Sequence, residues 1–170
     1  ITAGDSGPKK YEEIYENNIE HYRGKGKIRV WNSITVPMLG GVDIEHSVNL
    51  GYFDGKLKKM HQDKSKNINS DKSELSDIYF YRKQNVSSLL PVGLANSSWV
   101  SLVKDIQHLR VKTKPDVMVA PYPSIDSHPD HKYTTIALLE AIKNLKLKYG
   151  KIFLYTNHHP LSKLYPYGDR

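Results

Sequence analysis

Two histidines and two acids fall within six consecutive residues, in the segment DSHPDH that runs from Asp126 to His131. His128 and His131 are three positions apart, so on a helical turn their imidazoles point to the same side. A histidine that binds a metal or acts as an acid usually needs a carboxylate to hold its second ring nitrogen, and Asp130 lies between the two histidines. One short segment therefore offers a metal ligand, a proton donor and an orienting group.

The same segment leads into a stretch with helical periodicity, which allows a simpler interpretation. Pro129 suits a first helical turn, where its missing N–H is not needed. Asp126 or Ser127 could cap the helix, and the motif would then be only a helix start. The positions that would face the core are Leu138, Ala141, Ile142, Leu145 and Tyr149. Capping does not require two histidines and a second acid, so a functional site is favoured.

Two histidines and one acid do not complete a catalytic zinc site, which takes three protein ligands and a water. The chain has no cysteine, so the other ligands must be His, Asp or Glu, which suits zinc or another divalent ion. The HExxH pattern is absent from the sequence. The candidates elsewhere in the chain are Asp5, Asp54, His46, His158 and His159.

Some of these candidates could also have a purely structural role. Asp54 lies in FDGK, which is typical of an ordinary turn. Asp5 ends an expected strand and could line a pocket. His158 and His159 follow another expected strand, and they could face the same crevice or belong to a structural loop. Both readings of this histidine pair stay open.

The composition indicates a soluble globular chain that forms one domain. It has 170 residues, of which 38% are apolar and 25% charged, and its net charge is +7. The lysine-rich stretches are typical of a solvated basic surface, and no nucleic-acid-binding motif is recognisable, so we expect no nucleic acid partner. No apolar run is long enough to span a bilayer and no signal-peptide pattern is visible, so a cytoplasmic location is favoured.

The chain alternates between strand-like and helix-like segments. The first half contains the end of a strand at residues 1–7, an amphipathic helix at 9–22 that GKGK ends, strands at 28–36 and 46–53, and a polar loop at 56–76. The second half contains a helix at 97–113 capped by Ser97 or Ser98, a buried parallel strand at 116–123, the helix after DSHPDH, and a strand at 151–156.

This order predicts an α/β layered fold with a largely parallel sheet. Ligands in such folds bind at the carboxyl ends of the strands. Three polar segments follow expected strands, namely TAGDSG, SIDSHPDH and TNHHP. Their convergence is the topological reason to expect a site.

The motif HPDH, together with two other stretches, resembles the LmbE/PIG-L-like zinc-dependent deacetylases. These enzymes remove the acetyl group from N-acetylglucosamine conjugates and related amides. The similarity is strong in residues 114–141, KPDVMVAPYPSIDSHPDHKYTTIALLEA, and weaker in TAGDSG at residues 2–7 and VNLGYFDGKL at 48–57. It implies a Rossmann-like three-layer fold, a bound zinc ion and an N-acetyl sugar substrate.

The resemblance also implies roles for individual residues. His131 would be a zinc ligand, and His128 would stabilise the oxyanion of the tetrahedral intermediate and help to protonate the leaving amine. Asp130 would orient one of these histidines, and Asp126 would lie near the site. We expect the substrate contacts to include Asp5, Asp126, His158 and His159.

One departure from the family pattern is large. The family motif AHPDDE, which supplies a His and an Asp as zinc ligands and another Asp as general base, is absent from this chain. We expect residues 1–170 to be a single deacetylase domain whose first strand lies before Ile1. The alternative function is a carbohydrate-binding relative that keeps the fold without a complete metal site. The exact substrate and the oligomeric state are not encoded in any recognisable pattern.

Overall fold

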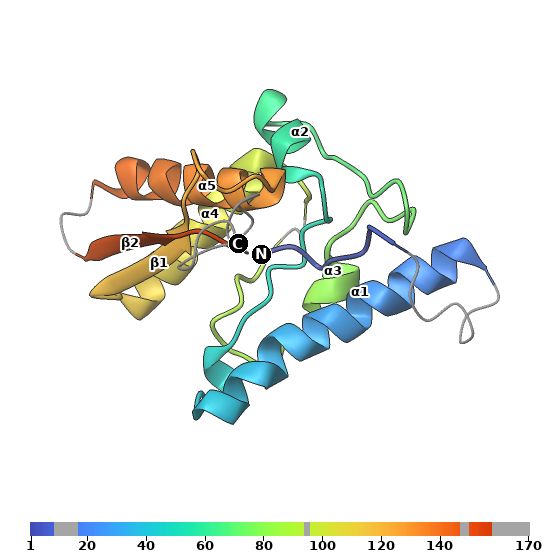
Figure 1. Ribbon diagram of the computed structural model, residues 1–170, viewed down its shortest axis with the longest axis horizontal. Helices are drawn as coiled ribbons and strands as arrows, with labels where there is room; N and C mark the ends of the chain where they lie inside the picture. The colour runs from blue at the N-terminus through green and yellow to red at the C-terminus, as the bar shows by residue number, and fades with distance from the viewer. Residues whose placement is uncertain (9–16, 94–95, 147–149, 158–170) are drawn as a thin grey trace, which may run out of the picture.

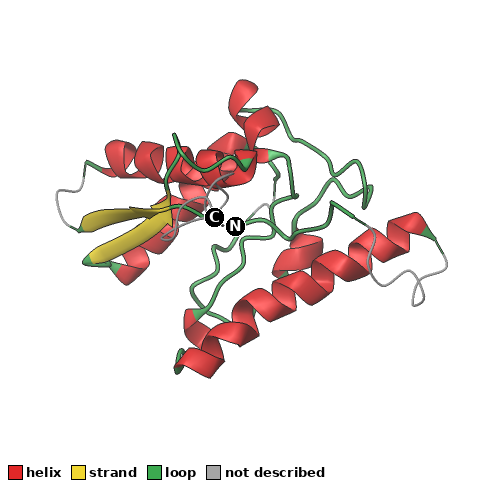
Figure 2. Ribbon diagram, viewed as in Figure 1, coloured by secondary structure: helices red, strands yellow, loops and turns green. Residues whose placement is uncertain are grey.

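The computed structural model describes residues 1–8, 17–93, 96–146 and 150–157 and combines helices with a small parallel sheet. Figure 1 shows the long helix α1 on the opposite side of the molecule from the two strands, with the chain start between them. Helices and loops make up most of the described chain (Figure 2). In chain order the elements are α1 (Asn18–Thr35), η2 (Val36–Gly40), η3 (Ile44–His46), α2 (Leu57–Gln62), α3 (Tyr79–Arg82), α4 (Trp99–Thr113), β1 (Val117–Pro121), α5 (Pro129–Leu145) and β2 (Lys151–Tyr155).

The C-terminal part of the described chain is a parallel β–α–β unit. β1 pairs with β2 in parallel, with Val117 opposite Lys151 and Pro121 opposite Tyr155, and α5 connects the two strands. The strands and the helix that the sequence predicts here are confirmed. The fold is therefore of mixed α/β composition with a two-stranded parallel sheet in its described part.

The expectation that the first of these strands is buried is wrong for one of its faces. Val117 and Val119 are 52% and 64% exposed, and Phe153, which pairs with Val119, is 56% exposed. Alternate residues of a strand point to opposite faces, so the exposed residues share one face of the sheet. A short apolar run does not reveal whether both faces or only one is covered.

Helix α4 forms as its pattern predicts. The Ser98 side chain accepts a hydrogen bond from the Ser101 N–H, and Lys114 ends the helix in a left-handed conformation at φ 46°. Trp99, Leu102, Val103 and Ile106 are buried, and Leu109 packs partly against the core. This face of α4 packs against α5, so the helix supports the segment that carries the two histidines.

Helix α1 overturns two expectations for the N-terminal part. Residues 28–36 were expected to form a strand and 24–27 to end a helix, but α1 runs through all but the last of them. Gly26 is not a helix end: a Cβ there would lie 2.5 Å from the Tyr81 ring, so the glycine permits close packing inside the helix. Val30 and Ile34 are fully buried four residues apart, which is helical spacing. Residues 9–16 lie outside the described part.

The strand expected at residues 46–53 is also wrong. Only Tyr52 pairs there, in an isolated parallel bridge with Thr2 in which the Ala3 N–H donates to the Tyr52 carbonyl at 2.7 Å. The DGK turn after it is confirmed, and α2 begins inside the stretch that was expected to be a loop. Residues 1–5 lie beside residues 52–55, and residues 55–57 contact the start of α5.

The core contains a charged network as well as apolar side chains. Arg82 pairs with Asp105, and the Tyr52 hydroxyl donates to the same carboxylate oxygen at 2.6 Å. Burial, followed by the nearby Asp105 charge, raises the pKa of Tyr52 well above its ordinary range. The largest fully buried apolar side chains of the described residues are Trp99, Tyr52, Tyr81, Phe53, Ile34 and Leu57.

Within the described residues, no helix is long and apolar enough to cross a membrane.

Candidate functional site

The start of α5 positions both histidines of the DSHPDH segment. His128 is the N-cap of the helix, and its Nδ1 accepts a hydrogen bond from the Asp130 N–H at 3.2 Å. The cap is therefore His128 and not Asp126 or Ser127. Pro129 occupies the first turn as predicted. One turn further along, His131 lies beside His128, with 4.8 Å between their ring centroids and 37° between their planes.

Asp126 holds the two histidines in place. Its side chain is fully buried, its Oδ1 accepts from the His128 N–H at 3.0 Å, and its Oδ2 lies 3.1 Å from Nδ1 of His131. The Asn157 N–H, just after β2, also donates to Oδ2 at 3.1 Å. Asp126 thus connects the loop after β1, the start of α5 and the end of β2. It provides the orienting carboxylate that the sequence assigned to Asp130.

The Asp130 carboxylate binds the turn that follows residue 54. Its Oδ2 accepts from the Gly55 N–H at 2.6 Å and its Oδ1 from the Leu57 N–H at 3.3 Å. Burial, reinforced by the nearby Asp54 charge, raises the pKa of this carboxyl above its ordinary value, although the backbone hydrogen bonds oppose the shift. These contacts fix the DGK turn against α5. That the Asp130 carboxylate also orients a histidine stays a prediction.

If both rings are neutral, these hydrogen-bond partners imply opposite tautomers. An ionised carboxylate only accepts hydrogen bonds, so His131 carries its proton on Nδ1 and its lone pair on Nε2. His128 accepts at Nδ1, so it carries its proton on Nε2. One ring therefore presents a lone pair suited to a metal, and the other presents an N–H donor.

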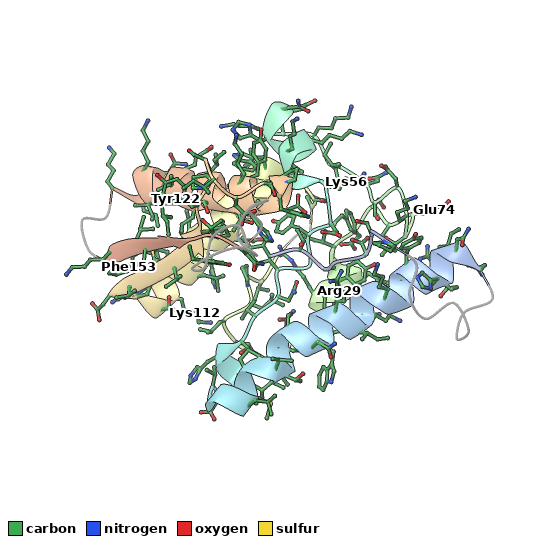
Figure 3. The ribbon with its side chains drawn as sticks, in the orientation of Figure 1. Arg29, Lys56, Glu74, Lys112, Tyr122 and Phe153 are labelled. Carbon is green, nitrogen blue, oxygen red and sulfur yellow. The ribbon has the colours of Figure 1, made fainter. Side chains whose placement is uncertain are left out.

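Both rings line a cavity of about 340 Å³ at the edge of the Thr2–Tyr52 bridge. Figure 3 labels Arg29, which lies on α1 and contributes to this cavity. The described residues around it are Thr2, Ala3, Gly4, Arg29, Ser33, Asn49, Asp54, His128, Asp130 and His131. The lining is mostly polar, and it combines proton carriers with one guanidinium group.

A second cavity, of about 440 Å³, adjoins the first at Asp130 and His131 of α5. It shares Thr2, Asp130 and His131 with the first cavity, but its other walls are largely apolar and include Val119 and Leu138. His131 therefore stands at the boundary between a polar cavity and an apolar one.

The other candidates from the sequence fall in different places. Asp5 is fully buried and does not line the polar cavity: its oxygens accept from the hydroxyls of Ser70 and Ser73, each at 2.7 Å, and from the Asp54 N–H at 2.9 Å. Asp54 does line the cavity, and its Oδ2 accepts from the Ser6 hydroxyl at 2.7 Å. Asp5 thus fixes the backbone of Asp54 by a hydrogen bond.

His46, His158 and His159 are not part of the described site. His46 lines a separate cavity with Met38 and Val42. His158 and His159 lie outside the described residues. Arg29 and Asn49 were missed by the sequence analysis because both fall in segments that were expected to be strands, and neither belongs to a recognisable motif.

The described residues fit one part of a zinc site. His131 has the arrangement usual for a metal-bound histidine, with Nδ1–H held by a buried carboxylate and the lone pair on Nε2. Across the described ranges, no group of three or more His, Cys, Asp or Glu side chains is arranged to hold a metal ion. A zinc ion on His131 would thus need ligands beyond those that the described residues bring together.

Comparisons of the chain with protein-family models, with curated proteins and with solved structures found no match. Function therefore has to be inferred from the residues and their geometry.

Proposed function

We propose that this chain carries part of the active site of a zinc-dependent amide hydrolase that removes the acetyl group from an N-acetyl sugar conjugate. The observation that supports the proposal best is a pair of imidazoles that line one polar cavity and whose Nδ1 atoms have different partners. Nδ1 of His131 lies against the Asp126 carboxylate, and Nδ1 of His128 lies against a backbone N–H. Such a pair can serve two different steps of one hydrolysis. The resemblance of the HPDH segment to the LmbE/PIG-L-like deacetylases points to the same chemistry.

In this proposal the two histidines have different roles. His131 would hold the metal through its Nε2 lone pair, and Asp126 would keep it in the required tautomer. His128 points its Nε2–H at the carbonyl oxygen of the substrate, where negative charge develops. The proton that the general base takes from the attacking water would then move to the nitrogen of the leaving amine. His128 keeps its Nε2–H in this step, because a neutral imidazole that lost this proton would become an anion. Bound zinc would lower the pKa of its water and polarise the acetyl carbonyl.

The remaining residues of the site keep these groups in position. Asp130 fixes the turn at Gly55 against α5, and Asp5 accepts a hydrogen bond from the backbone N–H of Asp54. Further metal ligands and the general base have to come from other residues of the protein.

The proposed fold extends the described sheet. The Thr2–Tyr52 bridge and the β1–β2 pair are both parallel, and helices pack beside them. We infer that they belong to one largely parallel sheet in a Rossmann-like three-layer arrangement.

The experiment is a measurement of amine release from a methyl glycoside of N-acetylglucosamine by the purified protein that contains this chain. Release that stops when a chelator removes the metal and returns when zinc is added supports the proposal. Sugar binding with no release in the presence of zinc would instead identify a carbohydrate-binding protein and contradict it.

A further inference from the structure

Arg29 is placed in the polar cavity by a glycine. Gly4 has φ +69°, and a Cβ on it would lie 2.8 Å from Cδ, 3.1 Å from Nε and 3.2 Å from Nη1 of Arg29. A side chain at position 4 would therefore occupy the path of the arginine. Because position 4 is glycine, the arginine can lie directly over the backbone that leads from the Thr2–Tyr52 bridge into the site.

A buried asparagine fixes the helix that carries Arg29 against the same backbone. Asn49 donates to the Thr2 carbonyl at 3.3 Å and to the Ser33 hydroxyl at 2.8 Å, and its own Oδ1 accepts from the Gly51 N–H. Ser33 follows Arg29 by one helical turn and lines the same cavity. The wall of the cavity on the α1 side is therefore held by hydrogen bonds, and the guanidinium lies on a defined surface.

The guanidinium of Arg29 also differs from those of the other described arginines. Arg23 donates to the Ser73 carbonyl and pairs with Glu20, and Arg82 pairs with Asp105. Arg110 donates to the Pro115 carbonyl. Within residues 1–8, 17–93, 96–146 and 150–157, Arg29 forms no hydrogen bond or ion pair with another side chain. Its five donors are thus available to a ligand in the cavity.

We propose that Arg29 binds an anionic group, a phosphate or a carboxylate, carried by the sugar substrate beside its N-acetyl group. A guanidinium is planar and can donate two parallel hydrogen bonds to either kind of anion. The inference rests on the proposed function, because it takes the ligand to be an N-acetyl sugar whose amide faces His128 and His131. Two carboxylates that could repel an anion, Asp54 and Asp130, also line the cavity. One oxygen of Asp54 accepts from the Ser6 hydroxyl, and both oxygens of Asp130 accept from backbone N–H groups.

The test compares binding of three sugars: methyl N-acetylglucosaminide, N-acetylglucosamine 1-phosphate and N-acetylmuramic acid. The first is neutral, the second carries a phosphate and the third a carboxylate. Titration calorimetry on the protein with a chelator present measures binding without turnover. We expect at least one anionic sugar to bind about tenfold more tightly than the neutral one, which is the usual size of a hydrogen bond to a charged group.

Variants decide whether Arg29 is responsible. Arg29→Gln is expected to remove the preference for the anionic sugar, and Arg29→Lys to keep only part of it because the planar fork is lost. Lys27→Gln is the matched control: it removes the same charge from the same helix, at a residue that does not line the cavity, and it should keep the full preference.

Two results would overturn the inference: equal binding of all three sugars by the parent protein, or an unchanged preference in Arg29→Gln. The two proposals fail separately, because binding is measured without hydrolysis. A protein that prefers the anionic sugar through Arg29 but never releases amine contradicts the deacetylase. One that releases amine from the neutral sugar and shows no preference contradicts only the role of Arg29.

Discussion

The Oδ2 atom of Asp126 lies 3.1 Å from Nδ1 of His131, and the Asp126 side chain is fully buried while that of His131 is 27% exposed. A buried carboxylate on one ring nitrogen fixes both the orientation and the tautomer of the imidazole. The relationship joins residues five apart, across the proline that starts α5. It is the geometry from which we propose that His131 binds a metal.

The first prediction concerns the protons of the two histidines. At a pH where both rings are neutral, His131 should carry its proton on Nδ1 and His128 on Nε2, because their hydrogen-bond partners differ. Nitrogen-15 NMR of the imidazoles distinguishes the tautomers directly. The exposed His108 serves as a reference for a solvated ring. The same tautomer on both rings of the pair would contradict the assigned roles.

The second prediction concerns Asp126→Asn. The neutral amide no longer attracts the His131 N–H as a charged carboxylate does, so zinc affinity should fall by about 10- to 100-fold. Competition with a chromogenic chelator measures it. Asp116→Asn removes the same charge from an exposed residue just before β1 and should leave the affinity unchanged. Equal zinc affinity in Asp126→Asn and the parent would show that this carboxylate does not support a metal ligand.

The sequence could predict the elements around the site better than the contacts inside it. Strands at residues 116–123 and 151–156 and the helix between them follow from local periodicity and turn residues, and the structure confirms them. The orienting carboxylate was assigned to Asp130, because that residue lies between the two histidines. The choice of Asp126 depends instead on the path of the loop after β1 and on the end of β2, which are tertiary features.

The N-terminal half shows a second limit. Ile28, Val30 and Ile34 are β-branched residues, which favour strands, but tertiary packing overrides that preference and they lie in α1. Gly24 and Gly26 suggested a helix end, yet Gly26 is required inside the helix by the Tyr81 ring. No local pattern could reveal this contact between Gly26 and a residue 55 positions later. Arg29 was missed for a similar reason, because its place in the cavity depends on Gly4, which is distant in the sequence.

The third prediction concerns the buried pair of Arg82 and Asp105. The two side chains are 4% and 11% exposed, and Asp105 also accepts from Tyr52. Asp105→Ala leaves a buried guanidinium uncompensated and should lower the free energy of unfolding by about 3–5 kcal/mol. The contrast is Asp71→Ala at the surface pair with Lys56, where the acid is 68% exposed and the cost should be at most about 1 kcal/mol. Urea denaturation measures both, and similar costs for the two variants would contradict this account of the core.

The fourth prediction concerns Glu140 and pH. Partial burial raises the pKa of this carboxyl. Hydrogen bonds from Lys64 at 2.9 Å and Trp99 at 3.0 Å, together with the charges of nearby basic groups, outweigh burial and hold the pKa below its ordinary value. A lowered pKa gives stability that is present above the unfolded pKa, about 4.3, and is lost as the pH falls through the folded value.

Glu140→Gln should therefore be less stable than the parent at pH 7, by about 1 kcal/mol or less because the pair is partly exposed to solvent. The difference should shrink as the pH falls below about 4. Thermal unfolding followed by circular dichroism across this range measures the change. A difference that stays constant, or grows, toward low pH would show that the ionised carboxylate is not the stabilising form.

The most direct test of the proposed active site separates the roles of its two histidines. His131→Ala and His128→Asn are compared with the parent protein for bound zinc and for kcat in amine release from the N-acetyl sugar. Asparagine at position 128 can still cap α5 but does not reach as far as the imidazole Nε2–H. We expect His131→Ala to lose both zinc and activity, and His128→Asn to keep its zinc but to lose kcat by about 100-fold or more, because the donor to the oxyanion is removed. Zinc content and kcat equal to those of the parent in His131→Ala would contradict the account.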